Sequence, residues 1–129
     1  MTLEILVVVE DDAQMQLLIS MNLALDPRLH IVGSAANARD AIELARTSNP
    51  GLIIIDHFID GDVMGLEAAP LLKEAAPHAK LLLFTSHDLR LEANREPAID
   101  AFLSKTHIKR LLPLVQELLG LQPVAPVIT

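Results

Sequence analysis

The sequence contains no cysteine, tryptophan or tyrosine, and its only aromatic side chains with a carbon ring are three phenylalanines among 129 residues. The absence of cysteine excludes disulfides, thiolate chemistry and cysteine-ligated zinc sites. With so few aromatic residues, the core has to be built from Leu, Ile, Val and Ala. That composition favours a buried parallel sheet covered by helices.

Positive charge is also scarce, since ten Lys and Arg residues face 17 Asp and Glu residues and the net charge is −7. An acidic chain repels nucleic-acid phosphates and anionic membrane surfaces, so we expect this chain to bind neither. No apolar run approaches the roughly 18 residues of a membrane helix. The N-terminus lacks the basic and long apolar regions of a secretion signal. We therefore expect a cytoplasmic protein.

Five short apolar runs predict strands that are buried on both faces, because they are continuous rather than alternating. The runs are Leu3–Val9, His30–Ala35, Leu52–Ile55, Lys80–Phe84 and Ala101–Leu103. Helical patterns separate them. The expected helices span Ala13–Leu25, with an apolar stripe of Leu17, Leu18, Met21 and Leu25; a segment capped by Asn37; Leu66–Ala76; and a last helix capped by Thr106 and ended by Gly120.

Two prolines limit the helical predictions. Pro70 lies inside the third pattern, so that helix is expected to start late or to be kinked. Pro97 excludes a long regular helix in the polar stretch from Asp88 onward, so the fourth helix should be short or irregular.

Strand and helix alternate five times, which predicts an α/β fold: a doubly wound, five-stranded parallel sheet flanked by about five helices. We expect one domain over residues 1–120. Residues 121–129 contain two prolines and no periodic pattern, so they should form a linker stub or a flexible C-terminal tail.

In open parallel sheets, ligands bind beyond the carboxyl ends of the strands. The first strand is followed there by Glu10, Asp11 and Asp12, the third by Asp56, the fourth by Thr85 and the fifth, a little further on, by Lys105. Clustered carboxylates need a compensating cation, and oxygen ligands favour Mg²⁺. A metal, a lysine and a hydroxyl around one aspartate are the groups that phosphoryl transfer to a carboxylate requires.

Each of these residues alone has an ordinary explanation. An acidic run is usually a solvated loop, an aspartate after a strand is usually a turn or cap residue, and Lys105 alone would be a surface lysine. Their order, each at a strand end, is what favours the functional interpretation. His57 and His87 follow two of these positions and are interpreted as rim or surface residues.

The residues resemble the response-regulator receiver domains of two-component signalling over about residues 3–119. The resemblance rests on the segments ILVVVEDD (5–12), LIIID (52–56), GLEA (65–68), LLLFTS (81–86) and AFLSK (101–105). It implies a flavodoxin-like topology with strand order 2-1-3-4-5.

The resemblance also implies a role for each site residue. Asp56 is the phosphoacceptor; Glu10, Asp11, Asp56 and the backbone carbonyl of Phe58 hold Mg²⁺ or Mn²⁺; Thr85 and Lys105 bind the phosphoryl group; and Thr85 and Phe102 form the switch. The implied donor is a histidine kinase or a histidine phosphotransfer protein. The implied output is binding to a downstream protein, to a C-terminal effector domain or to a second copy in a homodimer. Such a domain is not an enzyme beyond its own phosphorylation and a weak autophosphatase activity.

Several features depart from the family pattern. The loop after Asp56, HFIDGDVMG, is one residue longer than usual and carries the extra acids Asp60 and Asp62, which we expect to alter metal affinity. The span from Thr85 to Lys105 is about two residues short. Phe58 supplies bulk where many relatives have a polar side chain, so we expect it to hinder attacking water.

Three alternatives remain. A degenerate receiver would act as a phosphorylation-independent interaction module. A phosphatase or mutase resembling the haloacid dehalogenases would need a second Asp where this chain has Phe58. A flavin or nucleotide binder would need a Gly-rich phosphate loop after the first strand, where acids stand instead.

Overall fold

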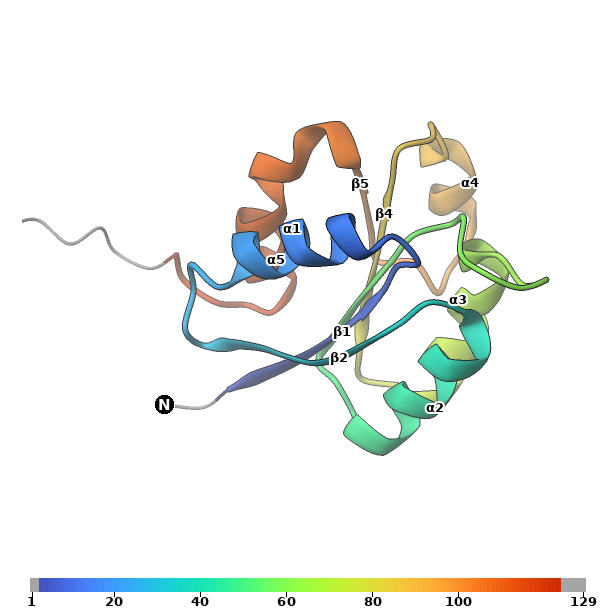
Figure 1. The fold of residues 1–129 in the computed structure, drawn as a ribbon, viewed down its shortest axis with the longest axis horizontal. Coiled ribbons are helices and arrows are strands. Elements are labelled where there is room, and N and C mark those ends of the chain that lie inside the picture. Colours follow the sequence, from blue (N-terminus) through green and yellow to red (C-terminus); the bar gives the residue numbers. More distant parts are fainter. Residues whose placement is uncertain (1–2, 124–129) are drawn as a thin grey trace, which may run out of the picture.

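The computed structural model describes residues 3–123, which form one doubly wound α/β domain (Figure 1). The elements in chain order are β1 (Glu4–Val9), α1 (Ala13–Leu23), β2 (Leu29–Ala35), α2 (Ala38–Ser48), β3 (Leu52–Ile55), α3 (Gly65–Ala75), β4 (Lys80–Thr85), α4 (Arg90–Arg95), β5 (Ala101–Ser104), the 3₁₀ helix η1 (Lys105–Arg110) and α5 (Leu111–Leu118). The five strands are all parallel, in the order β2-β1-β3-β4-β5, so the predicted fold class and strand order are confirmed.

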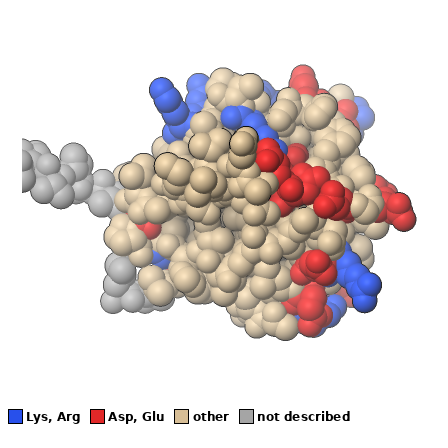
Figure 2. Space-filling view, viewed as in Figure 1, with Lys and Arg blue, Asp and Glu red and all other residues tan. Residues whose placement is uncertain are grey.

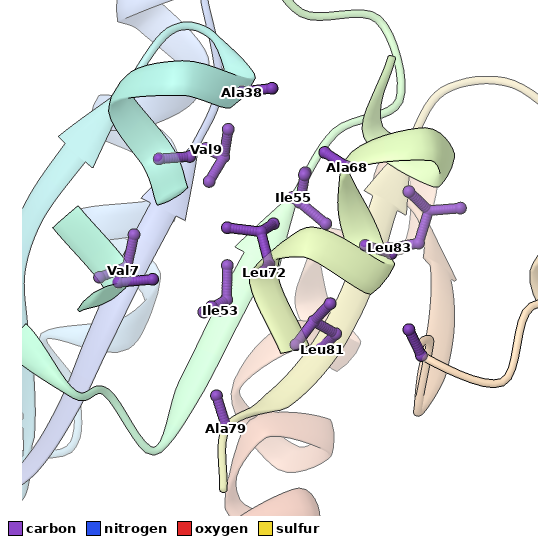
Figure 3. Packing of buried hydrophobic residues seen from close by; sticks show 14 of the residues in the cluster. Val7, Val9, Ala38, Ile53, Ile55, Ala68, Leu72, Ala79, Leu81 and Leu83 are labelled. Carbon is purple, nitrogen blue, oxygen red and sulfur yellow. The ribbon is translucent and has the colours of Figure 1, made fainter. Parts of the chain in front are cut away.

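Alternate residues of the central strands belong to two separate hydrophobic cores, one on each face of the sheet. On β1, Val7 and Val9 face the helices α2, α3 and α4, whereas Leu6 and Val8 face α1 and α5. Figure 3 shows Leu72 of α3 lying over Ile53 and Ile55 of β3 in the first of these cores. Because both faces are covered, β3 is buried at every residue, which explains its continuous apolar sequence.

The stripe predicted for the first helix is not its buried face. Ile19 and Leu23 are buried instead, while Leu17, Leu18, Met21 and Leu25 are all exposed. The helix is apolar around most of its circumference and carries no charged residue, so periodicity did not single out one face. Figure 2 shows the resulting surface free of charge along α1.

The boundaries of the next three helices agree only in part with the predictions. Asn37 caps α2 as predicted, since its side chain accepts the N–H of Asp40. The helix α3 does not start late: it begins at Gly65 and continues through Pro70. The fourth helix is short, as expected.

The last helix differs most from its prediction. Its residues divide into η1 and α5, and the cap of η1 is Ser104 rather than Thr106, because the Ser104 hydroxyl accepts the Thr106 N–H. Pro113 lies in the first turn of α5, where its missing N–H costs no hydrogen bond within the helix.

The C-terminal boundary was predicted at Gly120, which has a positive φ of 70° and ends the α5 region. Beyond it, the Leu121 N–H still donates to the Gln116 carbonyl, and the Gln122 carbonyl accepts from Arg28. The rest of the predicted tail, residues 124–129, lies outside the described part of the chain. Within residues 3–123, none of the helices combines the length and apolar composition needed to span a bilayer.

Candidate functional site

Three of the predicted residues converge beyond the carboxyl ends of β1, β3 and β5. We call Glu10, Asp56 and Lys105 the acidic site. The Lys105 ammonium donates to Asp56 Oδ2 at 2.8 Å and also to Glu10 Oε1. Glu10 and Asp56 immediately follow the paired strands β1 and β3, and Lys105 starts η1 directly after β5. Residues far apart in sequence are thus brought together by the parallel sheet.

Burial of the acidic site makes these contacts strong. Asp56 is 8% exposed and Glu10 is 2% exposed. Burial raises the pKa of Glu10 above its ordinary value, an effect that the neighbouring Lys105 only partly offsets. Burial would lower the pKa of Lys105, but its hydrogen bonds to Asp56 and Glu10 outweigh this and raise it. The lysine is therefore a fixed positive charge beside Asp56.

The backbone fixes the orientation of the Asp56 carboxylate. Its Oδ1 accepts the N–H of His57 at 2.7 Å, while Oδ2 accepts from Lys105. The start of α3 lies directly against this point, since the Gly65 N–H donates to the His57 carbonyl at 2.8 Å. A Cβ on Gly65 would lie 2.2 Å from the Asp56 carbonyl oxygen, so this position accepts only glycine without a backbone shift.

The two predicted switch residues lie on β4 and β5. Thr85 is completely buried at the end of β4, and its hydroxyl accepts the backbone N–H of His87 at 3.4 Å. Phe102 is half-buried on β5, with the Arg90 guanidinium 5.6 Å from the centre of its ring. This cation–π contact connects α4 to Phe102 on β5.

The predicted metal ligands are only partly assembled. Asp11 is exposed and stands apart from the lysine-bridged pair, and Figure 2 shows acidic side chains gathered near the start of α1. Across residues 3–123, no group of three or more His, Cys, Asp or Glu side chains is placed to hold a metal ion. The backbone of Asp60, one of the two extra acids, bridges to Asn37 at the start of α2.

Sequence reasoning missed one feature of the site, a stack of aromatic rings beside it. The Phe58 ring lies 4.8 Å from the His57 ring and 4.3 Å from the His87 ring, measured between ring centres. The sequence predicts both histidines as rim or surface residues, with no contact between them and Phe58. The signal was their equivalent placement after two neighbouring strands, which brings them to the same edge of the sheet.

The comparisons with known proteins all point to the same family. The family model described as "Response regulator receiver domain" matches residues 6–116. The response regulator protein VraR of Staphylococcus aureus (strain NCTC 8325 / PS 47) is 31% identical over 108 residues, which cover 82% of this chain and 51% of VraR. The VraR protein of Staphylococcus epidermidis (strain ATCC 35984 / DSM 28319 / BCRC 17069 / CCUG 31568 / BM 3577 / RP62A) is 30% identical over 100 residues, covering 76% of this chain and 47% of that protein. The chain thus spans about half the length of the curated relatives it matches.

Solved structures show the same fold. The response regulator domain of Thermotoga maritima CheB superposes with a TM-score of 0.80 at 20% identity, covering 94% of this chain and 99% of that one. A LuxR-family DNA-binding response regulator from Staphylococcus aureus gives a TM-score of 0.80 at 21% identity, covering 91% and 99% of the two chains. With a family model that matches most of its length, this chain belongs to the response regulator receiver domains of two-component systems.

Proposed function

We propose that this receiver domain accepts a phosphoryl group on Asp56 from a phosphohistidine of a histidine kinase or histidine phosphotransfer protein. The observation that carries the proposal is the buried Asp56 carboxylate held by Lys105. In the transfer, an oxygen of Asp56 attacks phosphorus while the bond from phosphorus to the imidazole nitrogen breaks. The imidazole keeps the electron pair of that bond.

Each neighbour of Asp56 has a defined task. The His57 N–H holds Asp56 Oδ1 in place. The other oxygen, Oδ2, now accepts from Lys105, and it is the oxygen that would attack the incoming phosphorus. The Lys105 ammonium then neutralises charge on the phosphoryl oxygens, a form of electrostatic stabilisation that is strong in a buried site. The buried hydroxyl of Thr85 can turn toward the same group.

The donor chemistry of this site fits a hard divalent cation. Glu10, Asp11, Asp56 and the Phe58 carbonyl offer oxygen atoms only, which suits Mg²⁺ or Mn²⁺. Bound there, the ion would supply charge neutralisation for the phosphoryl group. Lys105 now donates to both Glu10 and Asp56, so an ion bound by these carboxylates would share them with the lysine.

The proposed output is a change at the switch. A phosphoryl group on Asp56 would attract Thr85, and the movement would free space for Phe102, which now lies under Arg90. The altered surface would bind a downstream protein, a C-terminal effector domain or a second copy.

The domain would turn over its own phosphoryl group only slowly and would have no other enzymatic activity. A degenerate, phosphorylation-independent module is not favoured, because every position that the chemistry needs is filled.

The test is phosphorylation by a small donor. We expect the protein, incubated with Mg²⁺ and acetyl phosphate, to gain the mass of one phosphoryl group. The gain should disappear in Asp56→Asn and without Mg²⁺. Asp60→Asn, which removes the same charge from the following loop, should still be modified. A gain that persists in Asp56→Asn would contradict the assignment of the acceptor.

A further inference from the structure

A groove runs along the surface between α2 and α3, which lie side by side on one face of the sheet (Figure 1). Its central part is a cavity of about 710 Å³. Two further hollows share residues with this cavity, one toward the loop after β3 and one along α3. We call the three connected hollows the α2–α3 groove. Its central part is lined by Arg39, Ile42, Arg46, Val63 and Leu71, none of which belongs to the acidic site or to the switch.

The floor of the α2–α3 groove is apolar and continuous with the core. Ile42 and Val63 are half-buried and pack against the buried residues of that face of the sheet. Leu71 stands beside them and is 45% exposed. An apolar partner that covered these side chains would remove their surface from water, which favours binding.

The rim of the α2–α3 groove is acidic. Five acidic residues and two basic ones line it: Asp40, Glu43, Asp60, Asp62 and Glu74 against Arg39 and Arg46. Arg46 is already paired with Glu43 at 2.8 Å. Figure 2 shows acidic side chains over α2, with basic ones beside them. The excess of acids gives the groove a negative field that attracts cationic partners.

The longer loop after β3 forms one end of the α2–α3 groove. The backbone N–H of Asp60 donates to the Ala36 carbonyl at 2.9 Å, and the loop bridges to Asn37 at the start of α2. Gly61 has a positive φ of 93°, which turns the chain between the two extra acids. Both Asp60 and Asp62 line the hollow next to the start of α2. This loop therefore extends the acidic rim beyond the two helices.

An amphipathic helix with basic flanks matches this combination of floor and rim. Its apolar residues, spaced at i, i+3, i+4 and i+7, would cover the apolar floor, and flanking Lys or Arg side chains would meet the acids. A second copy of the chain fits less well. Its apolar helix α1 carries no charge, and its exposed basic residues Lys109 and Arg110 lie at the end of η1. A contact of η1 with the groove would also be head-to-tail rather than a closed dimer.

We propose that the α2–α3 groove is a docking site for a basic, amphipathic helix of a partner protein. Leu71 is its apolar anchor, and Asp60 and Asp62 supply its preference for positive charge. This function goes beyond phosphoryl transfer, because no residue of the groove takes part in that chemistry. Docking should therefore be unchanged in Asp56→Asn.

The experiment titrates the whole protein with a synthetic helical peptide of Leu and Lys, in which Leu occupies the i, i+3, i+4 and i+7 positions. A matched peptide has Glu in place of every Lys. Backbone amide NMR shifts locate the bound peptide and give its Kd. The shifts should gather on α2, α3 and the loop between β3 and α3. The Glu peptide should bind at least about tenfold more weakly, and salt should weaken binding of the Lys peptide.

Substitutions on the protein separate the floor from the rim. Leu71→Ser should weaken binding of the Lys peptide by about tenfold, because it removes the apolar anchor. Asp62→Asn should weaken it by about two- to fivefold at low salt, the range of an exposed ion pair. Leu25→Ser on the far side of the sheet and Glu117→Gln on α5 alter an exposed leucine and an exposed acid, and both should bind as wild type.

Three results would overturn the docking site. The first is shifts that gather on α1 or spread over the whole surface. The second is equal binding of the two peptides, or undiminished binding in Leu71→Ser. The third is a change of the groove's amide shifts with protein concentration in the absence of peptide, which would assign the groove to a second copy. Weaker binding in Asp56→Asn would contradict its independence from the acidic site.

Discussion

Asp26 is completely buried, yet it lies far from the acidic site and takes no part in the proposed chemistry. Its Oδ1 accepts from the backbone and Nε of Arg28, and its Oδ2 accepts from Arg28 and from Gln116 of α5. Arg28 in turn donates to the Gln122 carbonyl. Asp26 therefore links the loop before β2 to α5, and its partner Arg28 links the same loop to Gln122 after α5.

We predict that Asp26→Asn destabilises the protein at neutral pH by about 1–3 kcal/mol, the cost of leaving buried polar groups poorly paired. The hydrogen bonds from Arg28 hold the pKa of Asp26 well below its ordinary value of 3.8. A lowered pKa contributes stability above the ordinary value and loses it as the pH falls toward the lowered one. The difference between wild type and variant should therefore shrink below about pH 4.

Urea unfolding of both proteins at neutral and acidic pH measures this difference. Glu43→Gln, which breaks the exposed pair of Glu43 with Arg46, is the matched control and should cost less than about 0.5 kcal/mol. A difference between wild type and Asp26→Asn that stays constant across the acidic range would show that ionisation of Asp26 is not its source.

For single residues, the sequence predicted which side chains gather at the site better than it predicted which side chains contact one another elsewhere. Glu10, Asp56, Thr85 and Lys105 were found because each directly follows a strand or lies within two residues of its end, and the fold rule then places them together. Asp26 and Gln116 have no such signal, since they are 90 positions apart and their contact depends on how α5 packs. The stacking of Phe58 on His87 likewise depends on loop geometry.

Among the elements, strands were easier to predict than helices. All five strands were found nearly to the residue, because burial on both faces leaves continuous apolar runs. The buried face of α1 was predicted wrongly, since a helix that is apolar nearly all round gives no periodic signal. The break between η1 and α5 was not predicted, because the apolar pattern continues through it. Predicting it would have required giving the position of Pro113 more weight than that pattern.

The junction of β3 and α3 gives a prediction at the element scale. Gly65→Ala should destabilise the protein by about 1–3 kcal/mol and slow phosphorylation of Asp56, because the new Cβ would overlap the Asp56 carbonyl and push the start of α3 away from the acceptor. Chemical denaturation and the acetyl phosphate assay measure the two effects.

Gly51→Ala is the control for this substitution, because its Cβ would meet Leu119 at 3.4 Å and Glu4 at 3.5 Å, which are ordinary contacts. It should change both stability and phosphorylation little. If Gly65→Ala behaved like Gly51→Ala, α3 would not be what fixes the position of Asp56.

For the molecule as a whole, the net charge of −7 means that any dissolved cation affects the stability of the fold. Screening of this charge by salt should stabilise the folded chain without any specific site. The proposed metal site at Glu10, Asp11 and Asp56 would add a second effect, because an ion that binds only the folded protein raises its stability by about 2.7 kcal/mol at a hundred times its Kd. The two effects are separable because only the second depends on particular carboxylates.

We therefore predict that Mg²⁺ raises the midpoint of thermal unfolding more than NaCl of equal ionic strength does. The excess should be lost in Asp11→Asn, whose carboxylate is exposed and free of the lysine bridge in the described chain, so that its removal leaves the fold intact. Glu74→Gln, an exposed acid on α3, removes the same charge and should keep the excess. An equal response to Mg²⁺ and NaCl, or an undiminished response in Asp11→Asn, would mean that the ion acts on the net charge alone.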